Sequence, residues 1–324
     1  MRRALIILGS LAALGAASFA ASALCGSTGC MSTPGADPMI WMLRFPRASS
    51  AFAVGGLLGL AGALMQVLLR NPLADPYVLG ISGGAAAGAM GMLLLAPAAL
   101  AAWSMQLGAL LGALVSIALL FGLARRALLR LTPAASASPS GVRLILTGVM
   151  IASGFGALLT LLLSLAPDAR LRGMIFWLMG DLDNSLFYGP AWIALALSLS
   201  WAVAAAPRLN VLAHGDVTAH LLGVPVLRLR AIALFVASLA TASAVAVAGT
   251  IGFVGLVVPH ALRMVIGNDQ RILLPASALA GGAALTLADL LARTVAAPVQ
   301  LPVGVITALV GVPVFLILLG RSRA

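Results

Sequence analysis

The run Arg70-Asn71-Pro72-Leu73-Ala74-Asp75-Pro76-Tyr77-Val78-Leu79-Gly80 interrupts two long apolar stretches. The first stretch covers residues 51–69 and the second covers residues 78–95. Each is long enough to cross the hydrocarbon core of a bilayer as a helix, which takes ~20 residues. Pro72 and Pro76 remove backbone donors and so favour a break in the helix. The run therefore predicts a tight hairpin between two membrane spans.

The composition extends this prediction to the whole chain. Of the 324 residues, 62% are hydrophobic and 8% are charged. A water-soluble globule of this size would lack the polar surface to cover itself. We therefore predict an all-α polytopic membrane protein with a single transmembrane domain, residues 1–324. Ten spans are placed near residues 4–24, 48–69, 78–96, 100–124, 142–166, 187–206, 230–249, 251–267, 273–293 and 302–320.

Several classes of protein are excluded by what the chain lacks. All 19 basic residues are arginine and all eight acidic residues are aspartate. Without lysine there is no Walker A lysine or Schiff base, and without glutamate there is no H-E-x-x-H zinc-protease helix. The net charge of +11 comes without a basic stripe interleaved with aromatic residues, so nucleic-acid binding is not predicted. No catalytic residue, cofactor or metal site is assigned, since the histidines lack partners at helical spacing.

The distribution of arginines predicts the orientation of the spans. With the N-terminus inside, 14 of the 19 arginines fall on the inner side and five fall outside. The positive-inside rule therefore places both termini in the cytoplasm and favours an even number of spans. The five exceptions are Arg44, Arg47, Arg170, Arg172 and Arg293.

The N-terminal region leaves two questions open. Residues 1–24 form an uncleaved first span or a secretory signal that ends at Ala21-Ser22-Ala23, and we favour the span because the apolar run is long enough to cross. Cys25 and Cys30 follow it closely. They form a disulfide if that end faces an oxidising compartment, and otherwise remain free thiols.

A polar segment of about residues 207–230 stands out between two predicted spans. Asp216 precedes a short helical pattern, and Gly223 and Pro225 follow as stop signals. A short amphipathic helix in such a connector is typical of a docking element for a partner protein. The alternative is a connector that lies on the bilayer surface.

Four motifs in register carry a resemblance to a known family. They are the segments 70–84, 215–225, Ala248-Gly249-Thr250-Ile251-Gly252-Phe253-Val254-Gly255-Leu256-Val257-Val258-Pro259-His260, and 301–315. From about residue 40 to the C-terminus the chain resembles the FecCD/BtuC-like permease subunits of ABC importers for ferric siderophores, haem and cobalamin. The resemblance implies ten helices, cytoplasmic termini and a location in the bacterial inner membrane. It also implies a homodimer with the path at its axis, two copies of an ATP-binding subunit inside and a periplasmic substrate-binding protein outside.

The resemblance also implies roles for particular residues. For coupling to the ATPase these are Gly215, Asp216, Ala219, Leu222 and Gly223, of which Ala219 and Gly223 preserve an Ala-x-x-x-Gly spacing. Ordinary helix and stop-signal composition is the alternative for them.

Arg44, Arg47 and Arg293 fall at positions that receive acidic residues of the binding protein in the family. Charge pairing across an interface gives orientation and a fast on-rate. Lipid phosphate is the competing partner for these arginines.

Asn71 and Leu73 correspond to positions that narrow the cytoplasmic end of the pathway. Neutral and apolar side chains can seal a gate without holding an ion. The alternative for Asn71 is a residue that turns the chain before Pro72.

Asp289 supports a rival function of another class. A carboxylate inside a span is costly and often functional, so it suggests a proton-coupled secondary transporter. Arg293 lies four residues later on the same helical face, and we favour a local ion pair between the two. Among substrates, ferric siderophore is placed first, with cobalamin and haem as alternatives. A heterodimer with a paralogue remains an alternative to the homodimer.

Overall fold

The computed structural model describes residues 2–31, 33, 37–95, 104–128, 139–182 and 188–321. Over these residues the chain forms helices, joined by turns, with one pair of very short antiparallel strands. The elements are α1 (Arg2–Leu24), β1 (Cys25–Gly26), β2 (Gly29–Cys30), α2 (Pro38–Leu68), the 3₁₀ helix η1 (Pro76–Leu79), α3 (Ile81–Leu95), α4 (Ser104–Leu128), α5 (Pro139–Ser164), α6 (Asp168–Leu178), α7 (Tyr188–Ala213), α8 (Asp216–Leu221), α9 (Val226–Ala248), α10 (Val254–Ile266), α11 (Gln270–Thr294) and α12 (Val303–Arg321).

The number of spans agrees with the sequence. Among the described residues, eight helices are long and apolar enough to cross a membrane: α1, α2, α4, α5, α7, α9, α11 and α12. The two shorter apolar helices, α3 and α10, occupy the other two predicted spans. The prediction of an all-α polytopic membrane protein with about ten spans is therefore confirmed.

The predicted start of the second span is wrong. The second helix starts at Pro38, well before the predicted residue 48, because Asp37 caps it by accepting the N–H groups of Met39 and Ile40. Proline at the first helical position suits this start, since its missing N–H would have no partner there. Helix α6 was not predicted.

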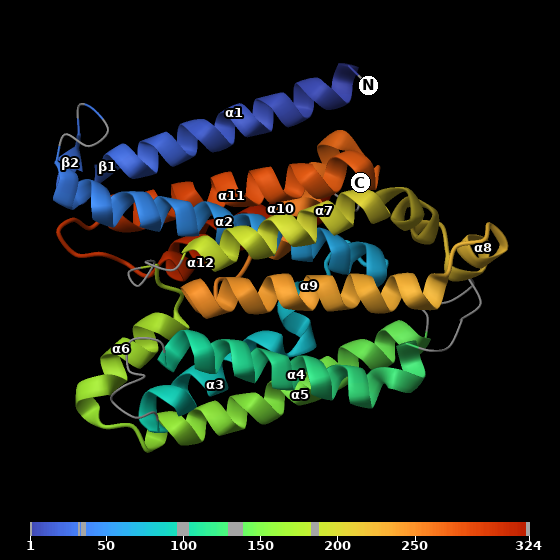
Figure 1. Cartoon of the computed structure of the whole chain (residues 1–324), viewed down its shortest axis with the longest axis horizontal. Helices are drawn as coiled ribbons and strands as arrows, with labels where there is room; N and C mark the ends of the chain where they lie inside the picture. Colours follow the sequence, from blue (N-terminus) through green and yellow to red (C-terminus); the bar gives the residue numbers. More distant parts are fainter. Residues whose placement is uncertain are drawn as a thin grey trace.

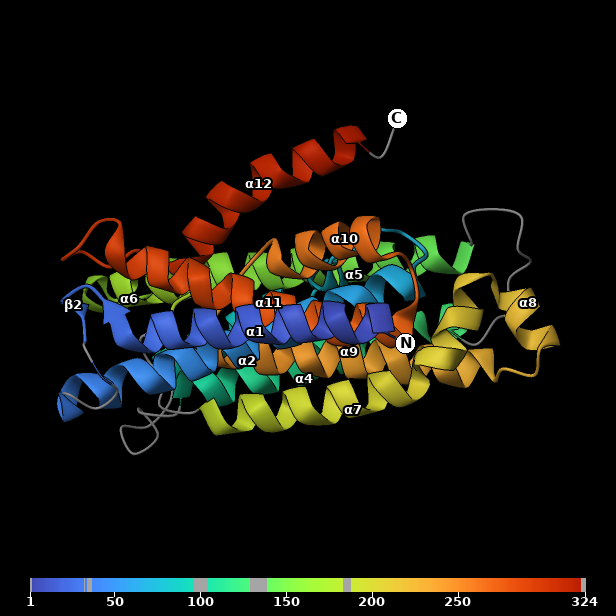
Figure 2. The ribbon, with the colours of Figure 1, turned by 90° about the horizontal axis from the view of Figure 1, so that it is seen from above.

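The long helices run side by side along one axis (Figure 1). In the most apolar stretch of α2, 94% of the residues are buried inside the protein. Helix α2 is therefore the central helix of the bundle. A Cβ atom on Gly62 would lie 1.7 Å from the carbonyl oxygen of Gly255 in α10, and one on Gly55 would lie 2.2 Å from that of Gly281 in α11. Glycine therefore lets α2 touch two neighbours backbone to backbone, as small residues do in membrane bundles. Helix α12 diverges from the rest (Figure 2).

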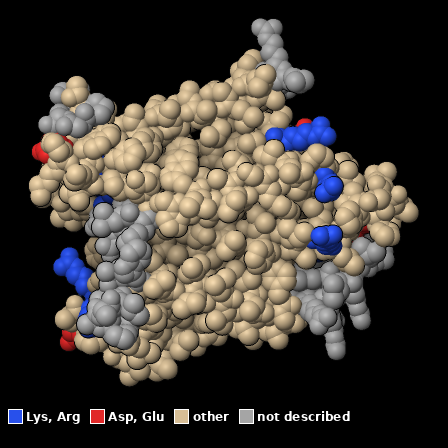
Figure 3. Space-filling model, viewed as in Figure 1, with Lys and Arg blue, Asp and Glu red and all other residues tan. Residues whose placement is uncertain are grey.

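The two ends of the bundle differ. The start of α1, the end of α12 and helix α8 lie at one end, which we call the α8 end, and β1 and β2 lie at the other, the β1–β2 end (Figure 1). Both termini on one side agree with an even number of spans. On the face in Figure 3, charged side chains lie near the two ends and the middle carries none, as expected for a belt that contacts lipid.

Candidate functional site

At the β1–β2 end, a disulfide joins Cys25 and Cys30 and closes the turn between the two short strands. The sequence left this pairing open. Arg44 of α2 reaches the turn and donates to the Thr28 hydroxyl at 2.8 Å and to the Gly29 carbonyl at 2.9 Å. The turn that follows α1 is thereby fixed to α2.

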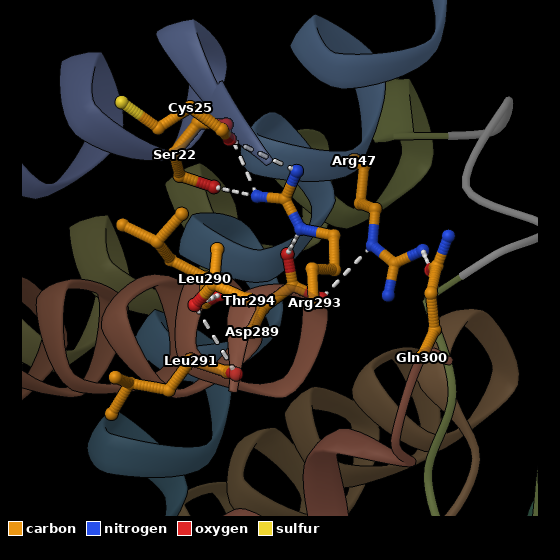
Figure 4. Close-up of polar contacts among 9 residues, drawn as sticks. All are labelled: Ser22, Cys25, Arg47, Asp289, Leu290, Leu291, Arg293, Thr294 and Gln300. Atoms are coloured by element: carbon orange, nitrogen blue, oxygen red, sulfur yellow. Dashed lines mark hydrogen bonds and ion pairs between the residues drawn. The ribbon is translucent and has the colours of Figure 1, made fainter. Parts of the chain in front are cut away.

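A buried carboxylate joins the helices beside this turn (Figure 4). Asp289 of α11 is fully buried and pairs with the Nε atoms of Arg47, at 2.9 Å, and Arg293, at 3.0 Å. Arg293 also donates to the Ser22 hydroxyl of α1 at 2.7 Å, and Arg47 donates to Gln300 at 2.8 Å. The predicted Asp289–Arg293 ion pair is confirmed, whereas the contribution of Arg47 was missed. The cluster ties α1, α2 and α11 together.

The three arginines expected to dock a binding protein do come together. Arg44, Arg47 and Arg293 are 6%, 7% and 4% exposed and line one pocket of about 230 Å³. Their guanidinium groups are largely used inside the protein, since a single buried carboxylate faces Arg47 and Arg293 and neutral oxygens face Arg44. The docking role stays a prediction.

The hairpin of residues 70–80 lies at the α8 end, where Arg70 contacts Asp216. The side chain of Asn71 accepts the N–H of Leu73 at 2.9 Å, so Asn71 turns the chain as its alternative role requires. Both residues are exposed, Leu73 to 37%, which leaves them free to line a passage. Their gate role stays a prediction.

The rest of the hairpin is held firmly. Asp75 caps η1 by accepting the N–H of Tyr77 at 2.7 Å, and the Tyr77 hydroxyl accepts the N–H of Ile251 at 3.0 Å. Burial raises the pKa of the Asp75 carboxyl and of the Tyr77 hydroxyl. The hairpin is therefore fixed to the 248–260 motif, which brings two of the four family motifs into contact.

The connector between α7 and α9 is shorter than the predicted coupling segment, residues 207–230. Helix α7 continues to Ala213 and α9 starts at Val226, because Pro207 is accommodated inside α7. Neighbouring helices in a membrane bundle allow such a proline within a span. The connector is therefore residues 214–225, with α8 in its middle, beyond the ends of α7 and α9 (Figures 1 and 2).

The predicted coupling residues divide into supporting and outward-facing ones. Gly215 and Gly223 have φ values of 125° and 79°, which favour glycine. A Cβ on Gly223 would meet nothing within 4 Å, so its conformation and not close packing requires glycine. Ala219 is fully buried, while Leu222 is 68% exposed. Leu221, which was not among the predicted coupling residues, is 80% exposed. Helix α8 thus presents an apolar tip.

Asp216 connects α8 to the hairpin. It is 2% exposed, and its Oδ2 accepts from Arg230 of α9 at 2.7 Å. Its Oδ1 accepts from Arg70, the residue directly before Asn71. Arg70 has a φ of 45°, unusual for a residue other than glycine. The three residues, the Asp216 cluster, were not predicted as a unit.

Among the described residues, no group of three His, Cys, Asp or Glu side chains is placed to hold a metal ion. Asp216 and Asp289, which are buried at opposite ends of the bundle, are each held by two arginines.

Comparison with known proteins agrees with the motifs. The model of the FecCD transport family matches residues 4–321. The vitamin B12 import system permease protein BtuC of Escherichia coli O9:H4 (strain HS) is 38% identical over 293 residues, covering 90% of this chain and 86% of the relative. BtuC of E. coli O17:K52:H18 is 39% identical over 298 residues, covering 91% of this chain and 88% of the relative. A solved metal-chelate type ABC transporter in an inward-facing conformation is 28% identical, with a TM-score of 0.84. The match covers 98% of this chain and 99% of the solved chain. The chain belongs to the FecCD transport family.

Proposed function

We propose that the chain is the membrane permease subunit of an ATP-driven importer. A separate ATP-binding subunit, in two copies per transporter, docks on α8, and a periplasmic substrate-binding protein docks at the β1–β2 end. Family membership and the BtuC relatives support the assignment. The observation that carries the coupling step is the Asp216 cluster, which connects α8 directly to the hairpin.

The apolar tip of α8 suits a cleft in the ATPase. Val217, Leu221 and Leu222 are 38%, 80% and 68% exposed, while Ala219 anchors the opposite face. Such a cluster of apolar side chains at the surface marks a protein contact. A displacement of α8 would move Asp216, and through Arg70 it would reach Asn71 and Leu73 at the proposed gate.

The orientation follows from this docking. With the α8 end in the cytoplasm, the pocket of Arg44, Arg47 and Arg293 faces the periplasm, where the binding protein delivers substrate. Arg47 and Arg293 share the one carboxylate of Asp289 there, and Arg44 contacts neutral oxygens. The surplus of positive charge favours acidic residues of a partner. The location is the bacterial inner membrane, as for other importers of this kind.

A second copy of the chain completes the pathway in this proposal. An apolar groove of about 300 Å³ lies between α10, α11 and α12 and includes Val257, Leu287 and Val310. Helix α12 diverges from the bundle (Figure 2) and carries exposed Leu309, 68%, on its surface. Packing of a second copy, or of a paralogue, against this region would cover both and place a path along the dimer axis.

Cobalamin is the first substrate to test. The sequence alone placed ferric siderophore first, but the two relatives described above are named as vitamin B12 permeases. Ferric siderophore and haem come next, since the matching structure is of the metal-chelate type.

Reconstitution tests the function. We expect proteoliposomes that contain the chain, its ATPase and a binding protein loaded with cobalamin to take up cobalamin when ATP is supplied. An ATPase variant unable to hydrolyse ATP is the matched control and should abolish uptake. Uptake that follows a pH gradient with no ATPase present would instead establish the secondary transporter. The double pairing of Asp289 with Arg47 and Arg293 argues against that rival, because both carboxylate oxygens already face guanidinium groups.

A further inference from the structure

A basic cavity at the α8 end borders Gly223 of the proposed coupling segment and contains two arginines to which the transport cycle described above gives no role. It has a volume of about 550 Å³ and lies between the end of α7 and the start of α9. Arg208 and Arg228 line it and are exposed, and its described lining contains no acidic residue. Trp201 and Ile232 line it as well. In Figure 3, basic side chains lie at this end, where α7 and α9 adjoin α8.

Along the two helices, the polar and apolar lining residues lie at different distances from the α8 end. On α7, Trp201 and Arg208 are seven residues apart, so they share a face and Trp201 lies about 10 Å deeper in the span. On α9, Ile232 follows Arg228 by four residues and lies about 6 Å deeper. Both helices therefore place an arginine at the mouth and an apolar side chain toward the middle of the bilayer.

The start of α9 adds to the positive potential. Pro225, which lines the cavity, is the N-terminal capping residue of this 23-residue helix and provides no side-chain hydrogen bond. The positive end of a helix dipole favours an anion. The arginine side chains supply the second, stronger attraction, because a guanidinium matches a phosphate with two parallel hydrogen bonds.

We propose that this cavity binds the phosphate of an anionic phospholipid, with the acyl chains along Trp201 and Ile232. A free phosphate would use the arginines but would leave the apolar half of the cavity empty. An acidic loop of the ATPase would contact the arginines from solvent. It would not cover the apolar side chains of Ile232 and Val203, which are 36% and 46% exposed on the same two helices. Basic pockets between spans, close to the membrane surface, are typical sites for anionic headgroups.

Binding of defined lipids to the purified full chain tests the proposal. Native mass spectrometry measures the affinity for phosphatidylglycerol, for phosphatidylcholine and for inorganic phosphate. We expect Arg208→Gln and Arg228→Gln to weaken phosphatidylglycerol binding about fivefold each and about thirtyfold together, since each basic residue near an anionic headgroup contributes about 1 kcal/mol. Arg271→Gln is the matched control, because Arg271 is an exposed arginine at the start of α11 and lies outside the cavity. It should leave binding unchanged.

A second variant separates a lipid from a free anion. Trp201→Ala should weaken phosphatidylglycerol binding and leave any binding of inorganic phosphate unchanged. Equal affinity for phosphatidylcholine, or wild-type binding by the double arginine variant, would overturn the proposal. So would inorganic phosphate that binds as tightly as the lipid. Loss of ATPase docking in the double variant with lipid binding intact would assign the cavity to the protein partner. None of these outcomes depends on transport, so they do not test the importer assignment.

Discussion

Replacing Asp216 with asparagine should separate the stability of the chain from its coupling to the ATPase. The substitution keeps the shape of the side chain and removes its charge. Arg230 then loses its buried counter-ion, since the two side chains are only 6% and 3% exposed. Arg70 loses its partner as well, but its side chain is 32% exposed and can turn to water.

The expected loss of stability follows from these exposures. Removing one member of a buried ion pair costs about 3–5 kcal/mol, because the remaining charge is left uncompensated. An exposed pair contributes only about 0–1 kcal/mol, so the contact with Arg70 adds little. Asparagine can still accept one hydrogen bond from Arg230. We therefore expect the free energy of unfolding to fall by about 3 kcal/mol, the lower end of the range for a buried pair.

Two measurements check this prediction. Titration with a denaturing detergent in mixed micelles, followed by circular dichroism, gives the free energy of unfolding. Proteoliposomes with the ATPase and binding protein give the number of substrate molecules imported per ATP hydrolysed, which we expect to fall about tenfold, within the usual range of coupling energies. Asp168→Asn, at an exposed aspartate in α6, is the control and should change neither. Wild-type stability together with a wild-type import ratio in Asp216→Asn would refute the reasoning.

Three further predictions concern the packing of the bundle. Asp289→Asn should lower the free energy of unfolding by about 3–5 kcal/mol, measured as above, because two buried guanidinium groups lose their counter-ion; an unchanged value would show that the cluster is not structural. Gly62→Ala should cost about 3 kcal/mol or more, since its Cβ would lie 1.7 Å from a carbonyl oxygen of α10, whereas Gly9→Ala meets nothing within 4 Å and should be neutral. The hydrogen bond from Asn210 lowers the pKa of Asp269, so this contact stabilises the fold above the unfolded pKa of about 3.9 and is lost as the pH falls through the lower folded value. The difference in thermal midpoint between wild type and Asn210→Ala should therefore shrink in acid, and a constant difference would contradict the linkage.

The spans could be predicted because their signal is local. An apolar run of about 20 residues is sufficient to predict a helix in a bilayer. The Asp289–Arg293 pair was predicted for the same reason, since residues four apart share a helical face. The start of α2 was missed because Arg44 and Arg47 look like loop residues in the sequence, while in the fold both are buried and hydrogen-bonded.

The two clusters of charges could not be predicted in full. Arg47 and Asp289 are 242 residues apart, and Arg70 and Asp216 are 146 apart. No periodicity connects positions at such separations, so only the packing of α2 against α11 and of the hairpin against α8 reveals the pairs. The exposed Leu221 had a weak signal, as it lies four residues after Val217 on the outer face of a short helix.

The two ends of the bundle carry charge clusters of the same composition. At each end one buried aspartate holds two arginines from different segments, Asp216 at the α8 end and Asp289 at the β1–β2 end. Among the described contacts, the single negative charge in each cluster faces two positive ones. At the β1–β2 end both arginines are buried, and burying the second positive charge costs free energy that a carboxylate of a docking partner would recover. If the proposed docking is correct, we predict that acidic residues of the partners act on the two ends of the bundle through these arginines.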